Sequence, residues 1–325
     1  MQRIAITGAS GFVGRHVIPK LRSSGFAVTA LVRSPESASK VQLLGCEAGL
    51  CDLSRIDSIA IQLQGIDSVV HMAARLDIYG AYEDFYADNV ALTQRMLDAS
   101  QKAGAKHFIM IGAAAVAIGS PDPFPLNESA RLVTKPAGPY GMTKLLAERA
   151  VLSAESPHLR RTVLRPPLVW AEDAPVFDSI AASVRKGQFA WIDGGRYSVA
   201  TIHVENLASA ILAALSSPDG KGAYFVSDGE NIQFRKLVEA ALFARGVKAP
   251  RLSLPRPVAQ MSATLAEATW AFLRLSGQPP ITKTVVDLIG GEFRIDDTRA
   301  RQELGYRNRI SIDDGLARFA SQSNA

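Results

Sequence analysis

The sequence predicts an α/β protein with a doubly wound parallel β-sheet and a smaller C-terminal lobe, and three observations support this fold class. The first half of the chain alternates short apolar runs with amphipathic stretches, a pattern typical of parallel strands joined by crossover helices. A glycine-rich turn follows the first apolar run. After Arg165 the alternation weakens and Pro- and Gly-rich breaks appear, which indicates a second lobe within the 325 residues.

Six strands and five helices are expected in the first half of the chain. The strands are expected at Arg3–Thr7, Ala27–Val32, Cys46–Leu50, Asp67–Met72, Lys106–Gly112 and Arg161–Leu164. The helices are expected at Phe12–Ser24, Pro35–Leu44, Arg55–Gln64, Asp84–Ala103 and Tyr140–Glu155. Because crossovers between parallel strands are right-handed, ligands are expected beyond the carboxyl ends of these strands.

The second half of the chain contains two more apolar runs, Ser198–His203 and Ala223–Val226, interpreted as strands that return to the sheet. The first domain is therefore expected at residues 1–165 together with 198–226, and the second lobe at 166–197 and 227–325. The segment Val258–Leu275 is strongly apolar but carries Glu267 and Arg274, so it falls short of a membrane span. We expect a helix that lines an apolar pocket, with a membrane-surface helix as the alternative.

The composition argues against several classes of function. The net charge is +5, but the basic residues are scattered without an aromatic-interleaved stripe, so nucleic acid is not an expected partner. A modest positive excess suits a small anionic ligand. Cys46 and Cys51 lack the Cys pairs or His partners of a zinc site, so two reduced thiols and no metal are expected. No signal-peptide pattern follows Met1, so a cytoplasmic protein without stable membrane insertion is expected.

The turn after the first strand reads Thr7-Gly8-Ala9-Ser10-Gly11-Phe12-Val13-Gly14 and opens a helix. Gly8 permits the tight turn, Gly11 allows close approach of the backbone to an anion, and Gly14 allows the helix to pack near the sheet. The helix N-terminus then offers N–H groups and the positive end of its dipole to a phosphate. This pattern indicates a Rossmann-type dinucleotide site, with candidate contacts at Thr7, Gly8, Ser10, Gly11, Phe12, Val13 and Gly14.

The end of the second strand distinguishes NAD from NADP. NAD-binding proteins usually place a carboxylate there for the ribose 2′-hydroxyl, whereas NADP-binding proteins place a cation there for the 2′-phosphate. Here the strand ends in Leu31-Val32-Arg33-Ser34, and no carboxylate occurs before Glu36. The planar guanidinium of Arg33 suits a phosphate, so NADP(H) is favoured, with NAD(H) as the alternative. The structural alternative for Arg33 is an ordinary exposed surface arginine.

Two further strand ends supply candidate cofactor contacts. Asp52 follows the third strand, where it could accept from the adenine amino group while Leu53 packs on the ring. The fourth strand ends in small residues that allow backbone to pass beside a dinucleotide, which makes candidates of Met72, Ala73 and Ala74. A capping Asp and a tightly packed Ala pair are the structural alternatives.

Tyr140 and Lys144 are four residues apart, so they lie on one face of the helix whose start Pro139 marks. The positive charge of Lys144 favours the tyrosinate and is expected to lower the pKa of Tyr140 from about 10 toward the operating pH. Tyr140 could then pass a proton to or from a carbonyl oxygen. Lys144 is also placed to hold a nicotinamide ribose.

Taken together, these motifs resemble those of the extended short-chain dehydrogenases/reductases over essentially the whole chain. The shared segments are Thr7–Gly14, Cys51–Leu53, His71–Ala74, Asn89–Val90, Tyr140–Lys144, Leu164–Pro166 and Ile202–Asn206. Within that family, the tail segments Phe293–Asp296 and Ala300–Tyr306 look most like the 3β-hydroxysteroid dehydrogenase and dihydroflavonol reductase branch. That branch acts mainly on bulky apolar carbonyls or alcohols.

The resemblance implies hydride transfer at C4 of the nicotinamide, with Tyr140 as acid/base and Lys144 as its activator. It adds Asn89 and Pro166 to the candidate cofactor contacts and makes the second lobe the expected substrate-binding lobe. It also implies a homodimer formed through two helices per subunit, which the two long helices expected before residue 155 could supply.

One departure from the family pattern affects the chemistry. The family carries a Ser or Thr just after the fifth strand that hydrogen-bonds the reacting oxygen, and Ala113 stands at that position here. Loss of one such preorganised donor costs about a hundred- to a thousandfold in rate. Ser120, Thr134 or a bound water could substitute for the missing hydroxyl.

Three functions are compatible with these residues. The leading one is an NADP(H)-dependent carbonyl reductase or alcohol dehydrogenase that acts on a bulky apolar substrate. A nucleotide-sugar epimerase or dehydratase is the second, although the run Ala113–Ala115 supplies no acid for a dehydratase. A catalytically impaired NADP(H)-binding sensor or scaffold protein is the third, motivated by the missing hydroxyl.

Other residues that attract attention have structural interpretations. His203 is expected to be a hydrogen-bonding residue at the lobe junction rather than a base, because Tyr140 already fills that role. Trp170, Trp191 and Phe189 could wall an apolar pocket or belong to the core of the second lobe.

Overall fold

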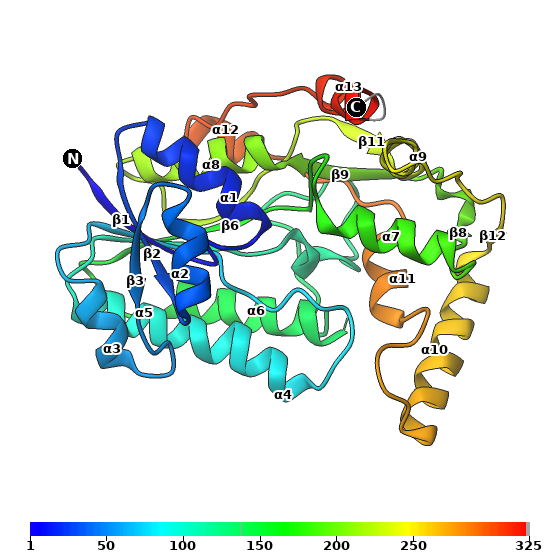
Figure 1. Ribbon diagram of the computed structural model, residues 1–325, viewed down its shortest axis with the longest axis horizontal. Coiled ribbons are helices and arrows are strands. Elements are labelled where there is room, and N and C mark those ends of the chain that lie inside the picture. The colour runs from blue at the N-terminus through cyan, green and yellow to red at the C-terminus, as the bar shows by residue number, and fades with distance from the viewer. Residues whose placement is uncertain (137, 323–325) are drawn as a thin grey trace.

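The computed structural model describes residues 1–136 and 138–322, and its centre is a seven-stranded parallel sheet (Figure 1). The strand order is β10-β6-β5-β4-β1-β2-β3. The strands are β1 (Arg3–Thr7), β2 (Ala27–Val32), β3 (Glu47–Leu50), β4 (Ser68–His71), β5 (His107–Ile111), β6 (Arg160–Arg165) and β10 (Gly222–Phe225). The order reverses between β1 and β4, so the sheet is doubly wound and the expected fold class is confirmed.

Helices cover both faces of this sheet in Figure 1. They are α1 (Phe12–Ser23), α2 (Pro35–Gln42) and α8 (Val204–Ser216) on one face, and α3 (Ile56–Gln62), α5 (Leu92–Lys102) and α6 (Gly138–Ser153) on the other. Alternation along β1 serves both cores, because Ile4 and Ile6 pack toward α1 and α8 while Ala5 packs toward the opposite helices.

The helix expected at Asp84–Ala103 is interrupted in the structure. It begins as the short helix α4 (Tyr82–Phe85), continues as a π-helical segment η1 (Tyr86–Ala91) and ends as α5. The buried positions of α5 include Thr93, Met96, Leu97 and Ser100, with the i, i+3, i+4, i+7 spacing of one helix face. π-Helical segments occur often at functional sites, and this one contains the candidate residue Asn89.

The second lobe is built on a separate sheet with the order β11-β9-β7. Its strands are β7 (Leu168–Trp170), β9 (Ser198–His203) and β11 (Asn231–Gln233), and a two-stranded sheet joins β8 (Trp191–Ile192) to β12 (Ser253–Leu254). Its other elements are α7 (Pro175–Arg185), η3 (Asp193–Gly195), α9 (Phe234–Ala244), α10 (Arg256–Leu273), α11 (Lys283–Ile289), α12 (Thr298–Glu303) and α13 (Ile312–Gln322).

Residues 198–226, which were expected to return to the large sheet, do so only in part. β10 does return and pairs with β6, and α8 packs against α1, but β9 pairs with β7 and β11 instead. The physical reason lies at Pro166 and Pro167, which lack backbone N–H groups and end β6. After these prolines the chain forms β7, and β9 pairs with β7 rather than with a strand of the large sheet.

The aromatic residues of the second lobe form its core. Trp170 and Trp191 are 0% and 1% exposed, and Phe189 packs edge-on against Trp191. Their interpretation as core residues therefore holds for the two tryptophans. The apolar segment near residue 258 is indeed helical, as α10, but most of its large apolar side chains are exposed rather than lining a pocket. Among the described residues no helix has both the length and the apolar character needed to cross a bilayer.

Candidate functional site

The glycine-rich turn connects β1 to α1 and is shaped by close backbone contacts. Gly8 has a φ of +72°, and a Cβ at this residue would lie 2.8 Å from the backbone nitrogen of Ala73. A Cβ at Gly14 would lie 2.1 Å from the carbonyl oxygen of Ala9, so this glycine allows the helix to pack against its own turn rather than near the sheet. Both positions therefore require glycine, for steric reasons.

The start of α1 has the properties of an anion site. Its N-cap is Gly11, which has no side chain to cap the helix, and no acidic residue occurs in the first turn. The first N–H groups of a helix have no intrahelical acceptor, and they lie at the positive end of the dipole. Ser10 and Gly11 are exposed, while Phe12 and Val13 are half-buried. This turn therefore fits the pyrophosphate of a dinucleotide.

Thr7 ties the end of β1 to the end of β4. Its hydroxyl oxygen lies 2.7 Å from Nδ1 of His71 and accepts hydrogen bonds from the backbone N–H groups of Met72 and Ala73 at 3.2 and 3.1 Å. Thr7 is fully buried. Its side chain therefore positions the loop beside the glycine turn, and the cofactor contact expected of Thr7 stays a prediction.

His71 continues this network to the other side. Its Nε2 lies 3.0 Å from the hydroxyl of Thr93, which donates its own proton to the carbonyl of Asn89 at 2.6 Å. Nε2 of His71 must therefore donate to Thr93, and Nδ1 accepts from Thr7. Burial, together with the nearby charge of Lys144, lowers the pKa of His71 to about 3. The imidazole is thus neutral at physiological pH.

Asn89 connects the π-helical segment to the loop after β4 and to α6. Its side-chain oxygen accepts from the backbone N–H of Arg75 at 2.7 Å, and its Nδ2 donates to the hydroxyl of Thr143 at 3.0 Å. Thr143 precedes Lys144 in α6. Asn89 therefore holds the loop containing Met72, Ala73 and Ala74 in register with the helix that carries Tyr140 and Lys144.

At the end of β2, Arg33 is exposed and Ser34 caps the next helix. The hydroxyl of Ser34 accepts from the backbone N–H of Ser37 at 3.2 Å, and Pro35 occupies the first position of α2. Arg33 thus stands on a rigid turn between β2 and α2, with its guanidinium accessible to an anion.

Asp52 is engaged in a local turn after β3. One of its carboxylate oxygens accepts from the backbone N–H of Ser54 at 2.8 Å and from its hydroxyl at 2.6 Å, and these bonds lower the pKa of Asp52. Leu53 packs against the core beneath α3 and α5. Asp52 therefore stabilises a local turn and does not cap α3, whose N-cap is Arg55, and the contacts of Asp52 and Leu53 with adenine stay a prediction.

Tyr140 and Lys144 both lie in α6, one turn apart. Lys144 is buried, and its ammonium donates to the carbonyl of Ile111, at the carboxyl end of β5, at 2.7 Å. Burial lowers the pKa of Lys144 to about 8, although the negative charge of Glu148 opposes this shift. Burial also raises the pKa of Tyr140 to about 12, so the expected lowering by Lys144 is not found in this structure.

Ala113 lies two residues after the end of β5 and precedes the 3₁₀ turn η2 (Ala114–Ala117). It is 5% exposed, and the backbone N–H of Ala114 donates to the carbonyl of Pro166 at 2.8 Å. No contact places Ser120 or Thr134, the two side chains suggested as substitutes for the missing hydroxyl, beside Ala113. The Ser120 hydroxyl accepts from the backbone N–H of Asp122 at 3.2 Å, and Thr134 is exposed.

A buried ion pair beside Lys144 was missed in the sequence. Arg165, the last residue of β6, donates to both carboxylate oxygens of Glu148, through Nε at 3.0 Å and through a terminal nitrogen. Both side chains are at least 95% buried. The i, i+4 spacing of Lys144 and Glu148 was the available signal, since it places both charges on one face of α6.

His203 is a capping residue at the start of α8. Its Nδ1 accepts from the backbone N–H of Glu205 at 3.3 Å, and its ring packs edge-on against Trp170 with centroids 5.0 Å apart. Burial lowers the pKa of His203. These contacts agree with a structural role.

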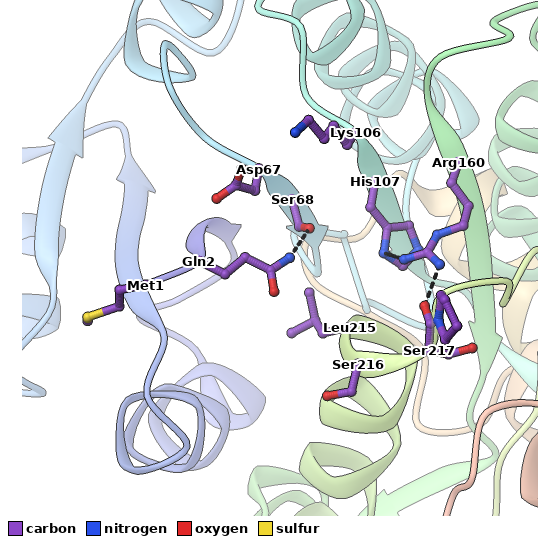
Figure 2. A pocket seen from close by; sticks show the side chains of 11 residues that line it. Met1, Gln2, Asp67, Ser68, Lys106, His107, Arg160, Leu215, Ser216 and Ser217 are labelled. Atoms are coloured by element: carbon purple, nitrogen blue, oxygen red, sulfur yellow. Dashed lines mark hydrogen bonds between the residues drawn. The ribbon is translucent and has the colours of Figure 1, made fainter.

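One cavity, of about 610 Å³, lies at the amino ends of the strands, opposite the glycine turn (Figure 2). Its polar side chains bond one another: Gln2 donates to Ser68 at 3.0 Å, and Arg160 donates to Nδ1 of His107 at 2.8 Å. Burial and the charge of Arg160 lower the pKa of His107 to about 3. This cavity is therefore a satisfied structural network away from the candidate site.

Comparisons with known proteins identify the family of this chain. A model of the NAD dependent epimerase/dehydratase family matches residues 4–226. A 4-hydroxy-2-methyl-3-oxo-4-farnesyl-3,4-dihydroquinoline-1-oxide ketoreductase from Stigmatella aurantiaca is 33% identical over 97% of this chain and 94% of its own. A decarboxylating sterol-4-alpha-carboxylate 3-dehydrogenase from Dictyostelium discoideum is 28% identical over 97% of this chain and 99% of its own.

The fold is similarly shared with solved structures. The crystal structure of gox2253 superposes with a TM-score of 0.78 at 25% identity, covering 99% of this chain and 98% of that one. The family model matches more than half of the chain, and a 33% identical relative spans nearly all of it. The chain therefore belongs to the NAD-dependent epimerase/dehydratase family, the extended short-chain dehydrogenases/reductases, and is an NAD(P)-dependent enzyme of that family.

Proposed function

We propose that this protein is an NADP(H)-dependent carbonyl reductase that acts on a bulky apolar substrate, with Tyr140 as proton donor. The observation that carries the proposal is the placement of Tyr140 and Lys144 on α6, with the ammonium of Lys144 bonded to the carboxyl end of β5 beside Ala113. When bound, NADPH would supply a hydride to the carbonyl carbon.

The protonation state of Tyr140 supports the reductive direction. With its pKa raised to about 12 by burial, the phenol keeps its proton at neutral pH and can donate it to the alkoxide that forms. Lys144, with its pKa lowered to about 8, is charged at neutral pH and favours loss of that proton.

The cofactor preference rests on Arg33. Its exposed guanidinium at the end of β2 suits the 2′-phosphate of NADP(H), and no carboxylate precedes Glu36 for a ribose 2′-hydroxyl. The glycine turn would hold the pyrophosphate, with Gly8, Ser10, Gly11, Phe12, Val13 and Gly14 as its contacts. Asp52, Leu53, Met72, Ala73, Ala74 and Pro166 complete the proposed cofactor contacts.

The substrate class follows from two relatives whose names describe a farnesylated quinoline and a sterol carboxylate. Both are large apolar molecules that carry an oxygen function. The proposal assigns the binding of such a substrate to residues 166–197 and 227–325. A homodimer and a cytoplasmic location, expected from the sequence, stay predictions.

The test is consumption of NADPH, followed by nicotinamide absorbance, against a panel of apolar ketones and aldehydes. Tyr140→Phe is expected to abolish turnover while a separate titration shows unchanged NADPH affinity, because the substitution removes only the phenol hydroxyl. Retained turnover in this variant would place the proton donor elsewhere.

The missing hydroxyl at Ala113 supports a second candidate, a sensor or scaffold protein that binds NADP(H) without turnover. Tight NADPH binding without consumption over the whole panel would favour this candidate. An epimerase returns the cofactor to its starting state and shows no net absorbance change, so a parallel assay that follows conversion of a nucleotide sugar to its epimer distinguishes it from both candidates.

A further inference from the structure

Helix α10 exposes its large apolar side chains and buries its small ones. Phe272 is 86% exposed and Leu265 is 69% exposed, whereas the buried positions are Ala259 and Ala263, which pack against Val286 of α11. The helix of an ordinary soluble protein shows the opposite pattern, with its large apolar stripe toward the core. The exposed residues, here named the α10 apolar face, are Val258, Met261, Leu265, Phe272 and Leu273, and the exposed Leu275 lies just beyond the end of the helix.

The α10 apolar face is continuous along the helix. Val258, Met261, Leu265 and Phe272 are separated by three, four and seven residues, the spacing that places side chains on one face of an α-helix. Figure 1 shows that α10 extends away from the rest of the chain, with its C-terminal end at the far tip. The whole length of this face is therefore accessible to a flat partner.

The charges around this face are mainly positive. Arg251 precedes the helix and Arg274 follows its last residue, and both are exposed. Glu267, the one carboxylate in residues 251–283 of the sequence, accepts from the backbone N–H of Lys283 at 2.8 Å. The face thus combines an apolar stripe with flanking cations, a combination that suits an anionic lipid surface.

A second copy of the chain fits this face less well. Antiparallel pairing of two α10 helices would place Arg274 of one copy near Arg251 and Arg256 of the other, and parallel pairing would place Arg274 beside Arg274. Either arrangement brings like charges together at the edge of an apolar contact. Headgroups of an anionic bilayer supply the opposite charge at both ends at once.

We propose that the α10 apolar face docks the protein on an anionic membrane surface, with α10 parallel to the bilayer plane. Apolar side chains enter the boundary between headgroups and acyl chains, while Arg251 and Arg274 contact lipid phosphates. This attachment is peripheral and reversible, and it does not depend on the reaction that the enzyme catalyses.

The experiment is flotation of the full chain with two kinds of vesicle, one of phosphatidylcholine alone and one of equimolar phosphatidylcholine and phosphatidylglycerol. The protein is expected to float with the anionic vesicles and to float less at high salt, because screening weakens attraction to the headgroups. Failure to float with the anionic vesicles at low salt would overturn the proposal.

The double variant Leu265→Ser, Phe272→Ser tests the face itself. Burial of one such side chain changes partitioning by at least about tenfold, so the pair is expected to lower vesicle binding by about a hundredfold. The matched control is Leu43→Ser, Ile61→Ser, which removes exposed apolar side chains of the first domain, 89% and 63% exposed, and should bind as the wild type does. Circular dichroism melting checks that both variants are folded.

Arg274→Glu tests the charge contribution and is expected to weaken binding to anionic vesicles about fivefold or more, because a polybasic contact is worth about 1 kcal/mol per cation near such a surface.

Equal binding by wild type and the apolar double variant would overturn the proposal. So would a dimer in light scattering that the double variant converts to a monomer without any change in vesicle binding.

Discussion

Thr7 and His71 join the carboxyl ends of the neighbouring strands β1 and β4 through a hydrogen bond of 2.7 Å between Thr7 Oγ1 and His71 Nδ1. The same hydroxyl receives two backbone N–H groups of the loop after β4. The point where the strand order reverses is therefore fixed by a buried polar network and not by packing alone.

The neutral form of His71 makes stability depend on pH. Its pKa is lowered to about 3 in the folded chain, against about 6.5 when unfolded, so between these values only the unfolded chain binds the proton. The free energy of unfolding should therefore fall as pH decreases from 6.5 toward 3. His71→Gln should reduce this slope by up to about 1.4 kcal/mol per pH unit, measured by urea denaturation.

His158→Gln is the control for this prediction, because it removes an exposed imidazole that takes no part in the network of Thr7 and His71. Equal slopes in wild type and His71→Gln would show that His71 does not titrate between folded and unfolded states. The buried His107, whose pKa is also lowered to about 3, maintains part of the slope in both proteins.

Arg33 should decide which dinucleotide binds. Arg33→Asp is expected to weaken NADPH binding about tenfold to a hundredfold, since it replaces a charge-assisted contact with a repulsive carboxylate, while NADH binding changes much less. Fluorescence titration with both cofactors measures this ratio. Arg309→Asp, at another exposed arginine, is the control and should leave both affinities unchanged. Equal losses for the two cofactors would contradict the NADP(H) assignment.

The sequence predicted the large sheet well because its features are local. The strands are four to six residues long and most are mainly apolar, although β6 (Arg160–Arg165) contains three arginines, and the glycine turn has steric requirements that few other residues satisfy. The position of β9 was wrong because pairing among strands of the second lobe depends on long-range contacts that alternation does not encode. The π-helical segment was missed for a similar reason, since its sequence has an ordinary helical pattern.

The sequence predicted only the part of the candidate site that depends on local spacing. Motif spacing places Tyr140 and Lys144 together, because α6 fixes their relation within one turn. The pairing of Glu148 with Arg165 joins residues 17 apart in sequence, and the contact of Lys144 with Ile111 joins residues 33 apart. Such contacts arise only when α6 packs on β5 and β6, so neither they nor the resulting pKa shifts follow from residue types.

Ala113 offers a gain-of-function test of the reductase proposal. Ala113→Ser restores a hydroxyl beside the carboxyl end of β5 and should raise carbonyl reductase turnover about tenfold or more, because a preorganised donor then faces the developing negative charge. The measurement is turnover at saturating NADPH with the best ketone of the panel. Ala117→Ser, at the far end of the 3₁₀ turn that follows Ala113 and also buried, is the control and should not raise it. A lower rate in Ala113→Ser would mean that the alanines shape a different site.

Glu148 should set the upper pH limit of activity through Lys144. Its negative charge raises the pKa of Lys144, against the lowering by burial that brings this value to about 8. Glu148→Gln removes that charge, so Lys144 should lose its proton at a lower pH and the basic limb of the rate profile should move down by about one unit. The substitution also leaves Arg165 without a carboxylate and should destabilise the fold by about 3 to 5 kcal/mol. If Glu148→Gln is destabilised but keeps the wild-type pH limit, Glu148 acts only in packing. The control is Glu155→Gln, at an exposed position, which should change neither the pH limit of activity nor the stability of the fold.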